Sequence, residues 1–210
     1  MLSNISLNHK ITVRYLIAVA FIALLSTGSY LSFSYLLKNN ETTAAIINVS
    51  GKQRMLSQRT ALFSKQLVSA NSSVEIDEIK FQLAQTVEMM QTGHLALISG
   101  STDLHIPNHH SKDIHDMYFG ELQMDKRVTM YIQAIQKLLS SPANTLNTAH
   151  PDYLYIDKHF NPLLEDLNNI VTQYQKEGEE SVRTIQQMEF FLWLLTLFIL
   201  LLEIQLIFRP

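Results

Sequence analysis

Two long apolar runs, one near each end of the chain, constrain the fold more than any other feature of the sequence. Residues 15–37 contain no charged side chain, and residues 190–208 contain only Glu203. At a helical rise of about 1.5 Å per residue, these runs extend about 34 Å and about 28 Å, enough to cross the hydrocarbon core of a bilayer. We therefore predict two transmembrane helices.

Basic residues beside the two runs predict the orientation in the membrane. Lys10 and Arg14 precede the first run, and Arg209 follows the second, so the positive-inside rule places both ends in the cytoplasm. A cleaved signal peptide is the alternative for the first run, but its apolar region is usually only about 7–15 residues long. The expected segments are a cytoplasmic N-terminus (1–14), transmembrane helices (15–37 and 190–208), a periplasmic domain (38–189), and the start of a cytoplasmic side whose output module is absent (209–210).

The region between the two runs has the spacing of helices and no long alternation typical of strands. Val49, Leu56 and Phe63 recur every seven residues and form the seam of a first helix that continues to about residue 70. We predict an all-α, antiparallel four-helix bundle flanked by the transmembrane helices. The further expected boundaries are Ser72 and Gly100 for the second helix, Asp113 and Leu139 for the third, with Leu122 in its core, and Asn161-Pro162 at the start of the fourth.

The composition excludes several classes of protein. The sequence contains no cysteine, which removes disulfides, thiolate nucleophiles and cysteine-based metal centres. Residues 38–189 carry 13 basic and 18 acidic side chains, so this domain has no basic surplus for nucleic acid. No Ser/His/Asp set, phosphate-binding glycine loop or carboxylate pair can be located, so we expect no catalytic residue, no enzyme and no cofactor.

A positively charged stripe lies early in the predicted bundle. No acidic residue occurs between Glu41 and Glu75, and the basic residues there are Lys52, Arg54, Arg59 and Lys65. At about 100° per residue, Ser50, Arg54 and Ser57 share a face about 120° from the seam, so we expect Arg54 to point away from the core. In a parallel homodimer two Arg54 side chains would meet near the two-fold axis, where guanidinium groups suit a small oxyanion. The alternative is a solvated surface arginine.

The stripe resembles a known signature. Residues Ser50-Gly51-Lys52-Gln53-Arg54-Met55-Leu56-Ser57-Gln58-Arg59 are similar to the signature of NarX-like nitrate/nitrite sensors and of the PilJ-like N-terminal domain of type IV pilus methyl-accepting transducers. Residues 114–122, with Tyr118-Phe119-Gly120, and the closing Phe208-Arg209-Pro210 are similar to the PilJ-like branch. This resemblance implies a periplasmic four-helix bundle that works as a homodimer and binds its ligand at the subunit interface through Arg54.

The NarX-like side of the resemblance further implies nitrate or nitrite as the ligand, with Ser50, Gly51 and Ser57 lining the site around Arg54. It also implies that the bundle controls a kinase, chemotaxis or cyclic-di-GMP output module. We therefore expect the sensory region of a two-pass receptor in a bacterial inner membrane. The alternative is a receptor that binds no small molecule and docks a ligand-loaded periplasmic binding protein.

Histidines are the remaining candidates for chemistry. His105, His109, His110 and His115 lie near aspartates in residues 101–116, and imidazole with carboxylate could hold a metal ion, but a solvated loop is the simpler interpretation. His94 falls on the apolar face of the second helix, so we expect it to be buried and hydrogen-bonded. Glu203 near the inner end of the second run can snorkel to the membrane interface or contact the first span.

Overall fold

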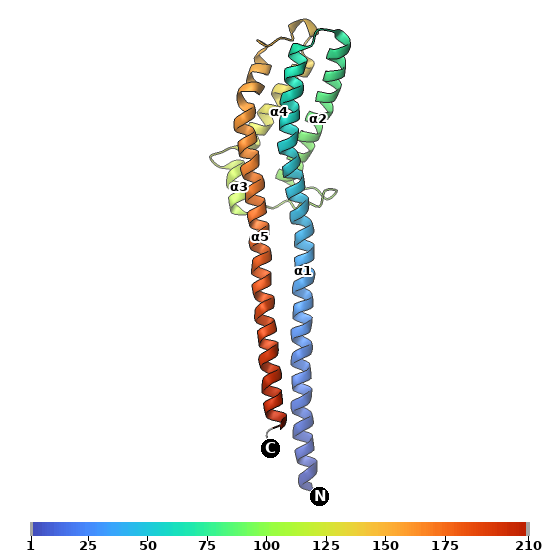
Figure 1. The fold of residues 1–210 in the computed structure, drawn as a ribbon, viewed down its shortest axis with the longest axis vertical. Helices are drawn as coiled ribbons and strands as arrows, with labels where there is room; N and C mark the ends of the chain where they lie inside the picture. Colours follow the sequence, from blue (N-terminus) through green and yellow to red (C-terminus); the bar gives the residue numbers. More distant parts are fainter. Residues whose placement is uncertain (1, 209–210) are drawn as a thin grey trace. The chain divides into compact units, whose positions relative to one another are not determined.

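The computed structural model describes the backbone of residues 2–208 and the side chains of residues 12–13 and 15–205. Over these residues it contains five α-helices, one short 3-10 helix and no strand. The elements are α1 (Leu2–Ser69), α2 (Ser73–Ser99), α3 (Lys112–Phe119), α4 (Met124–Ser140), η1 (Ala143–Thr145) and α5 (Pro151–Phe208), and Figure 1 labels the five α-helices. The predicted all-α class is confirmed.

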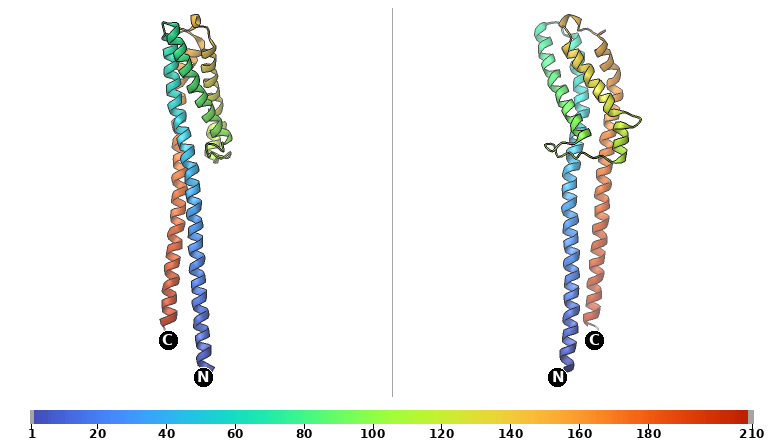
Figure 2. Two further views of the ribbon diagram at one scale, coloured as in Figure 1. Left: turned by 90° about the vertical axis from the view of Figure 1, so that its right-hand side faces the viewer. Right: turned by 180° about the vertical axis from the view of Figure 1, so that it is seen from behind.

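The chain divides into two compact units, and α1 and α5 each contribute to both. The unit Glu41–Glu177 is an antiparallel bundle of α2, α4 and the adjoining parts of α1 and α5, with the short α3 at one end (Figure 2). This confirms the predicted four-helix bundle.

The other unit comprises the residues up to Asn40 and those from Gly178 onward, and it pairs the apolar ends of α1 and α5. Both helices are long and apolar enough to cross a membrane. The side chains of Lys10, Arg14 and Arg209, on which the predicted orientation rests, lie outside the described residues. The orientation therefore stays a prediction.

A continuous apolar cluster fills the bundle. The predicted α1 seam of Val49, Leu56 and Phe63 is buried in this cluster, and the largest fully buried side chains are Tyr118 and Tyr131. Burial of one such side chain stabilises the fold by about 1.5–3 kcal/mol. Packing therefore holds the cysteine-free bundle together.

A row of polar side chains on α1 is buried beside the apolar seam. Its members, spaced alternately three and four residues apart, are Ser50, Gln53, Ser57, Thr60 and Ser64. Three of the hydroxyls donate to carbonyl oxygens of α1 itself, three residues earlier, over 2.8–3.1 Å. Within the described part of the chain, the Gln53 amide and the Ser64 hydroxyl have no hydrogen-bond partner.

The predicted signals at the ends of α2 are confirmed. Ser72 is the N-cap, and its hydroxyl accepts from the Glu75 backbone N–H over 3.2 Å. The Glu75 carboxylate accepts from the Asn71 N–H, one residue before the expected position of a capping box. Gly100 ends the helix at a φ of 80°, where an added Cβ would lie 2.8 Å from the Asn108 backbone.

The predicted third helix is wrong as a single element, because it divides into α3 and α4. Ser111 rather than Asp113 caps α3, since its hydroxyl accepts from the Ile114 N–H. The break follows at Gly120, and Gln123 before α4 adopts the left-handed conformation. Leu122, predicted for the core, lies in this break and is 42% exposed.

The predicted start of the fourth helix is also wrong. α5 begins at Pro151, eleven residues before the expected proline, and Pro162 lies inside the helix. The first turns hold because Tyr153 and Ile156 are buried in the core. Packing of this face therefore outweighs the backbone hydrogen bond that Pro162 cannot donate.

Gly93 of α2 provides the space for the buried Gln53 side chain, so Gly93→Ala should destabilise the bundle. An added Cβ would lie 2.2 Å from Gln53 Nε2. Overpacking of this kind costs about 1–3 kcal/mol, which urea unfolding can measure. In a Gln53→Ala background the same substitution should cost much less, because the clashing amide is gone.

Gly51→Ala is the matched control, since a Cβ there meets no atom within 4 Å. It should raise the free energy of unfolding by up to about 1 kcal/mol, because alanine favours a helix interior over glycine. Equal costs of Gly93→Ala in the two backgrounds would contradict the proposed packing of Gln53 against Gly93.

Candidate functional site

Arg54 lies on α1 with its side chain exposed, as its position off the apolar seam predicts. Its Nη1 donates to the Asn168 Oδ1 of α5 over 2.7 Å. Asn168 is a neutral amide, so this hydrogen bond orients the guanidinium and leaves its positive charge uncompensated. Sequence reasoning missed Asn168, because no local pattern shows which α5 side chain reaches Arg54.

A second arginine in the same bundle shows the opposite arrangement. Arg127 of α4 pairs through Nη1 with the Asp166 Oδ2 of α5 at 2.5 Å. The Asp166 side chain is 17% exposed, which makes this a partly buried ion pair. Arg127 is thus neutralised within the protomer. Among the described residues no carboxylate forms such an ion pair with Arg54.

The positively charged surface predicted on α1 is present. All its basic side chains are exposed: Lys52, Arg54, Arg59 and Lys65. The guanidinium carbon of Arg59 lies 5.3 Å from the centre of the Phe63 ring, so Arg59 makes a cation–π contact at the edge of the seam. Arg59 is therefore partly engaged in packing, whereas Arg54 is held by Asn168.

The predicted grouping of Ser50 and Ser57 on an outward surface with Arg54 is wrong. Ser50 is 2% exposed and Ser57 is 0% exposed, and both hydroxyls donate to α1 carbonyl oxygens. Small size lets them pack inside the bundle, on the side where α1 meets its neighbours. The predicted role of these two serines as ligand liners is untested, and their burial leaves them no exposed hydroxyl at this surface.

The helical neighbours of Arg54 on the exposed side are Gly51 and Gln58. They lie three residues before and four residues after Arg54, the spacings at which side chains of a helix are adjacent. Gly51 is partly buried and leaves open space, and Gln58 is exposed. The candidate site that the structure brings together is thus Gly51, Arg54, Gln58 and Asn168.

A second polar cluster is buried where α2, α3, α4 and α5 meet. His94 is 3% exposed, and its Nε2 lies 2.9 Å from the Asp125 Oδ1, which confirms the predicted buried, hydrogen-bonded histidine. Burial lowers the pKa of His94 below its ordinary value, and the Asp125 carboxylate opposes that shift. The Tyr118 ring lies beside His94 and shares a hydrogen bond with Tyr174, and burial raises the pKa of Tyr174 to about 12.

The loop histidines do not gather into a metal centre in the described part of the chain, where no group of three or more potential ligands is found. His105 and His109 are exposed. On the surface of α3, the His115 Nδ1 lies 3.7 Å from the Asp116 Oδ1. His110 turns inward, where its Nε2 lies 3.2 Å from the Ile98 carbonyl oxygen.

The described chain is thus an antiparallel helical bundle whose first and last helices continue into segments long and apolar enough to cross a membrane. The PilJ family, described as the N-terminal region of type IV pili methyl-accepting chemotaxis transducers, matches residues 35–153. This is more than half of the chain, and the chain belongs to this family. Comparisons with curated proteins and with solved structures gave no match.

The PilJ-like resemblance is thus confirmed, and the match spans the bundle part of α1 together with α2, α3 and α4. The family is that of the N-terminal region of chemotaxis transducers, which together with the two apolar helices indicates a transmembrane signalling receptor. Nitrate or nitrite as the ligand, and Arg54 as its contact, stay predictions.

His94 should make the stability of the bundle depend on pH. Because burial lowers its folded-state pKa, the unfolded chain binds a proton at this residue more tightly than the folded chain does. The contribution of His94 to stability is therefore complete above the ordinary value of 6.5 and falls as the pH drops below it. Urea unfolding at several pH values should show this loss, and His94→Gln should reduce it.

His109→Gln is the control, because His109 lies exposed in the loop. This variant should follow the wild-type dependence of unfolding free energy on pH. If the unfolding free energy of His94→Gln fell with pH as steeply as that of the wild type, other groups would be the cause of the lost stability in acid.

Proposed function

We propose that the chain is the sensory region of a two-pass inner-membrane receptor that binds a small oxyanion, nitrate or nitrite, at Arg54 across a homodimer interface. The observation that carries this proposal is the uncompensated, exposed charge of Arg54, which a neutral amide orients. The bundle then faces the periplasm, and the output module is one that the receptor controls in the cytoplasm.

The exposed face of α1 has the features of a helix-pairing surface. Met55 and Leu62 are 46% and 53% exposed and lie seven residues apart, the repeat of a parallel coiled coil. Gly51 lies one turn before Met55, where a missing side chain lets a second backbone approach closely. A second copy of α1 is thus the partner that this surface fits.

Pairing of two α1 helices would bring like charges together. Each copy carries Arg54 and Arg59 beside the Met55 and Leu62 face, and two-fold symmetry doubles this charge. At about 4 Å in a medium of dielectric near 20, two unit charges repel by about 4 kcal/mol. An oxyanion between the two Arg54 guanidiniums replaces repulsion with charge-assisted hydrogen bonds, which are bidentate where geometry allows.

Signalling follows if the empty and occupied sites favour different packings of α1. A ligand shifts an equilibrium only through its different affinity for the two states, and relief of repulsion between arginines supplies such a difference. Because α1 continues as one helix from Leu2 to Ser69, a shift or rotation of its bundle segment can pass along its backbone hydrogen bonds.

A second function, docking of a periplasmic binding protein, is favoured by the outward face of α2. Val74, Phe81 and Leu95 lie on this face at multiples of seven residues and are 75%, 64% and 50% exposed. Exposed apolar side chains at this spacing form a stripe on which a partner protein can pack. Anion binding by the purified chain alone distinguishes the two functions.

Arg54→Ala should abolish anion binding and leave the fold intact, because its truncation opens no cavity in the core. Each charge-assisted hydrogen bond contributes about 1.5–3 kcal/mol, so loss of both arginines weakens binding about a hundredfold or more. Nitrate and nitrite titration by calorimetry, on the full chain in lipid nanodiscs, measures this effect. Arg54→Lys should restore binding only in part, since an ammonium lacks the guanidinium fork.

Two variants serve as controls for this titration. Arg59→Ala should lower the melting temperature more than it lowers affinity, because Arg59 contacts the Phe63 ring. Asn168→Ala should weaken binding less than Arg54→Ala, since it removes the group that orients Arg54 and keeps the charge. Wild-type affinity in Arg54→Ala would exclude this site and favour the docking function.

The absence of cysteine allows a clean test of the dimer by disulfide cross-linking. Leu62→Cys should give cross-linked dimers in membranes, because equivalent residues in the seam of two paired α1 helices lie close enough for small movements to reach the Cβ separation of about 3.5–4.5 Å that a disulfide needs. Met130→Cys on α4, which is 42% exposed, is the control and should remain monomeric. Cross-linking through Phe81→Cys instead of Leu62→Cys would place the interface on α2.

A further inference from the structure

Two hydrogen bonds fix the register between the apolar ends of α1 and α5. The Asn39 Nδ2 donates to the Ser181 Oγ over 2.9 Å, and the Ser29 Oγ donates to the Glu189 Oε2 over 2.5 Å. The two bonds lie ten residues apart on α1 and eight apart on α5. The helices therefore run antiparallel with Ser29 level with Glu189.

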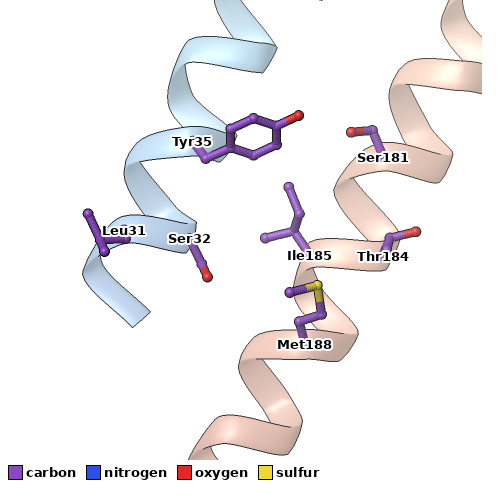
Figure 3. A pocket seen from close by; sticks show the side chains of 7 residues that line it. All are labelled: Leu31, Ser32, Tyr35, Ser181, Thr184, Ile185 and Met188. Atoms are coloured by element: carbon purple, nitrogen blue, oxygen red, sulfur yellow. The ribbon is translucent and has the colours of Figure 1, made fainter. Parts of the chain in front are cut away.

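A groove lies between the two helices, in the stretch that the two hydrogen bonds delimit. It has a volume of about 580 Å³, and Tyr35 of α1 points across it toward Ser181 and Ile185 of α5 (Figure 3). Its lining residues are Leu31, Ser32, Tyr35, Ser181, Thr184, Ile185 and Met188. Tyr35 lies beside Ser181, and Leu31 and Ser32 lie one turn further along, opposite Thr184 and Ile185 (Figure 3).

This register offsets the two apolar runs. The second run begins at Phe190, one residue beyond Glu189, and is therefore level with residue 28 of α1. Residues 30–37, the outer part of the first run, lie opposite residues 181–188. The outward α5 side chains at that level are largely polar and exposed: Arg183, Thr184, Gln186 and Gln187. Apart from Ser32 and Ser34, the α1 side chains there are apolar or aromatic, and the exposed ones among them are 51–69% exposed: Tyr30, Leu31, Phe33, Tyr35 and Leu37.

The segment in which both helices, side by side, carry no charged residue is short. Counted from the Ser29–Glu189 pair, Glu203 is level with Tyr15, so the shared segment covers about residues 15–28 of α1 and 190–202 of α5. Thirteen residues extend about 20 Å, whereas the hydrocarbon core is about 30 Å thick. Centring this segment in the bilayer leaves about 5 Å, one helical turn, at each end.

The two glutamates at the ends of the segment agree with such a placement. Within the described residues, the Oε1 atoms of both Glu189 and Glu203 are buried and lack a hydrogen-bond partner. A carboxylate costs less near the edges of the hydrocarbon core than at its centre, because a long side chain can reach the interface from there. Moving the core outward to include all of residues 15–37 would instead place Glu189 about 12 Å deep and take Arg183 into the hydrocarbon.

We propose that the hydrocarbon core ends within one helical turn of the Ser29–Glu189 pair, and that residues 33–37 of α1 form a surface for lipid headgroups. The inference rests on the proposed membrane receptor and moves the outer end of the first span, predicted from sequence as residues 15–37, from residue 37 to about residue 32. Tyr35 suits this layer, because its ring is apolar and its hydroxyl is polar. The outer end of the first run is thus an interfacial anchor.

Single cysteines at matched levels test the proposal, since the chain has none of its own. A membrane-impermeant thiol reagent is applied to the full chain in lipid vesicles with the bundle outside. Tyr35→Cys and Thr184→Cys lie within about one helical turn of each other along the helix pair, both outside the proposed boundary, and should label at similar, fast rates. Leu24→Cys and Leu194→Cys lie at similar levels inside the segment. Lipid should protect both from the reagent, although no protein atoms cover either side chain fully.

The possible outcomes separate this inference from the proposed receptor. Protection of Tyr35→Cys to the degree of Leu24→Cys, with fast labelling of Thr184→Cys, would overturn the boundary and restore the span of residues 15–37. Fast labelling of Leu24→Cys and Leu194→Cys would mean that the helices do not cross the bilayer, which overturns the boundary and the receptor together. A difference of at least about tenfold in rate between the two levels supports the proposal.

Discussion

The structure depends on one constraint, which is that α1 must serve two environments with a single unbroken helix. In residues 15–37 its side chains are apolar on most sides, whereas from Glu41 onward it buries one face and exposes the other. A helix satisfies its own backbone hydrogen bonds in both settings, which neither a loop nor an isolated strand could do in lipid. The fold then needs only three more helices to cover one face.

The main features of the fold could be predicted because they follow from local rules. The seven-residue repeat of Val49, Leu56 and Phe63 and the signals at Ser72 and Gly100 depend on spacing or on backbone geometry alone. The errors arose where tertiary packing decides the outcome. Pro162 is a good start signal, but burial of Tyr153 and Ile156 extends α5 through it.

The candidate site was partly predictable for the same reason. Arg54 could be placed on the exposed side by its angle to the seam, whereas serines carry almost no signal for burial. Ser50 and Ser57 are small, and their hydroxyls find partners in the same helix, so they fit a core as well as a surface. The neighbours that matter come from elsewhere, and Asn168 lies 114 residues away in the sequence.

The buried polar row on α1 has a mechanical consequence. Ser50, Ser57 and Thr60 donate within their own helix, so these hydrogen bonds travel with α1 when it moves and break none of the contacts between helices. Two hydrogen bonds cross from this row to another helix among the described residues, and both involve Tyr131 of α4: its hydroxyl donates to the Ser57 carbonyl oxygen at 3.4 Å, and it also shares a hydrogen bond with the Thr60 side chain. A movement of α1 along this face would therefore keep those three internal hydrogen bonds, whereas the fit of Gln53 against Gly93 and the apolar seam beside it set the position of the helix.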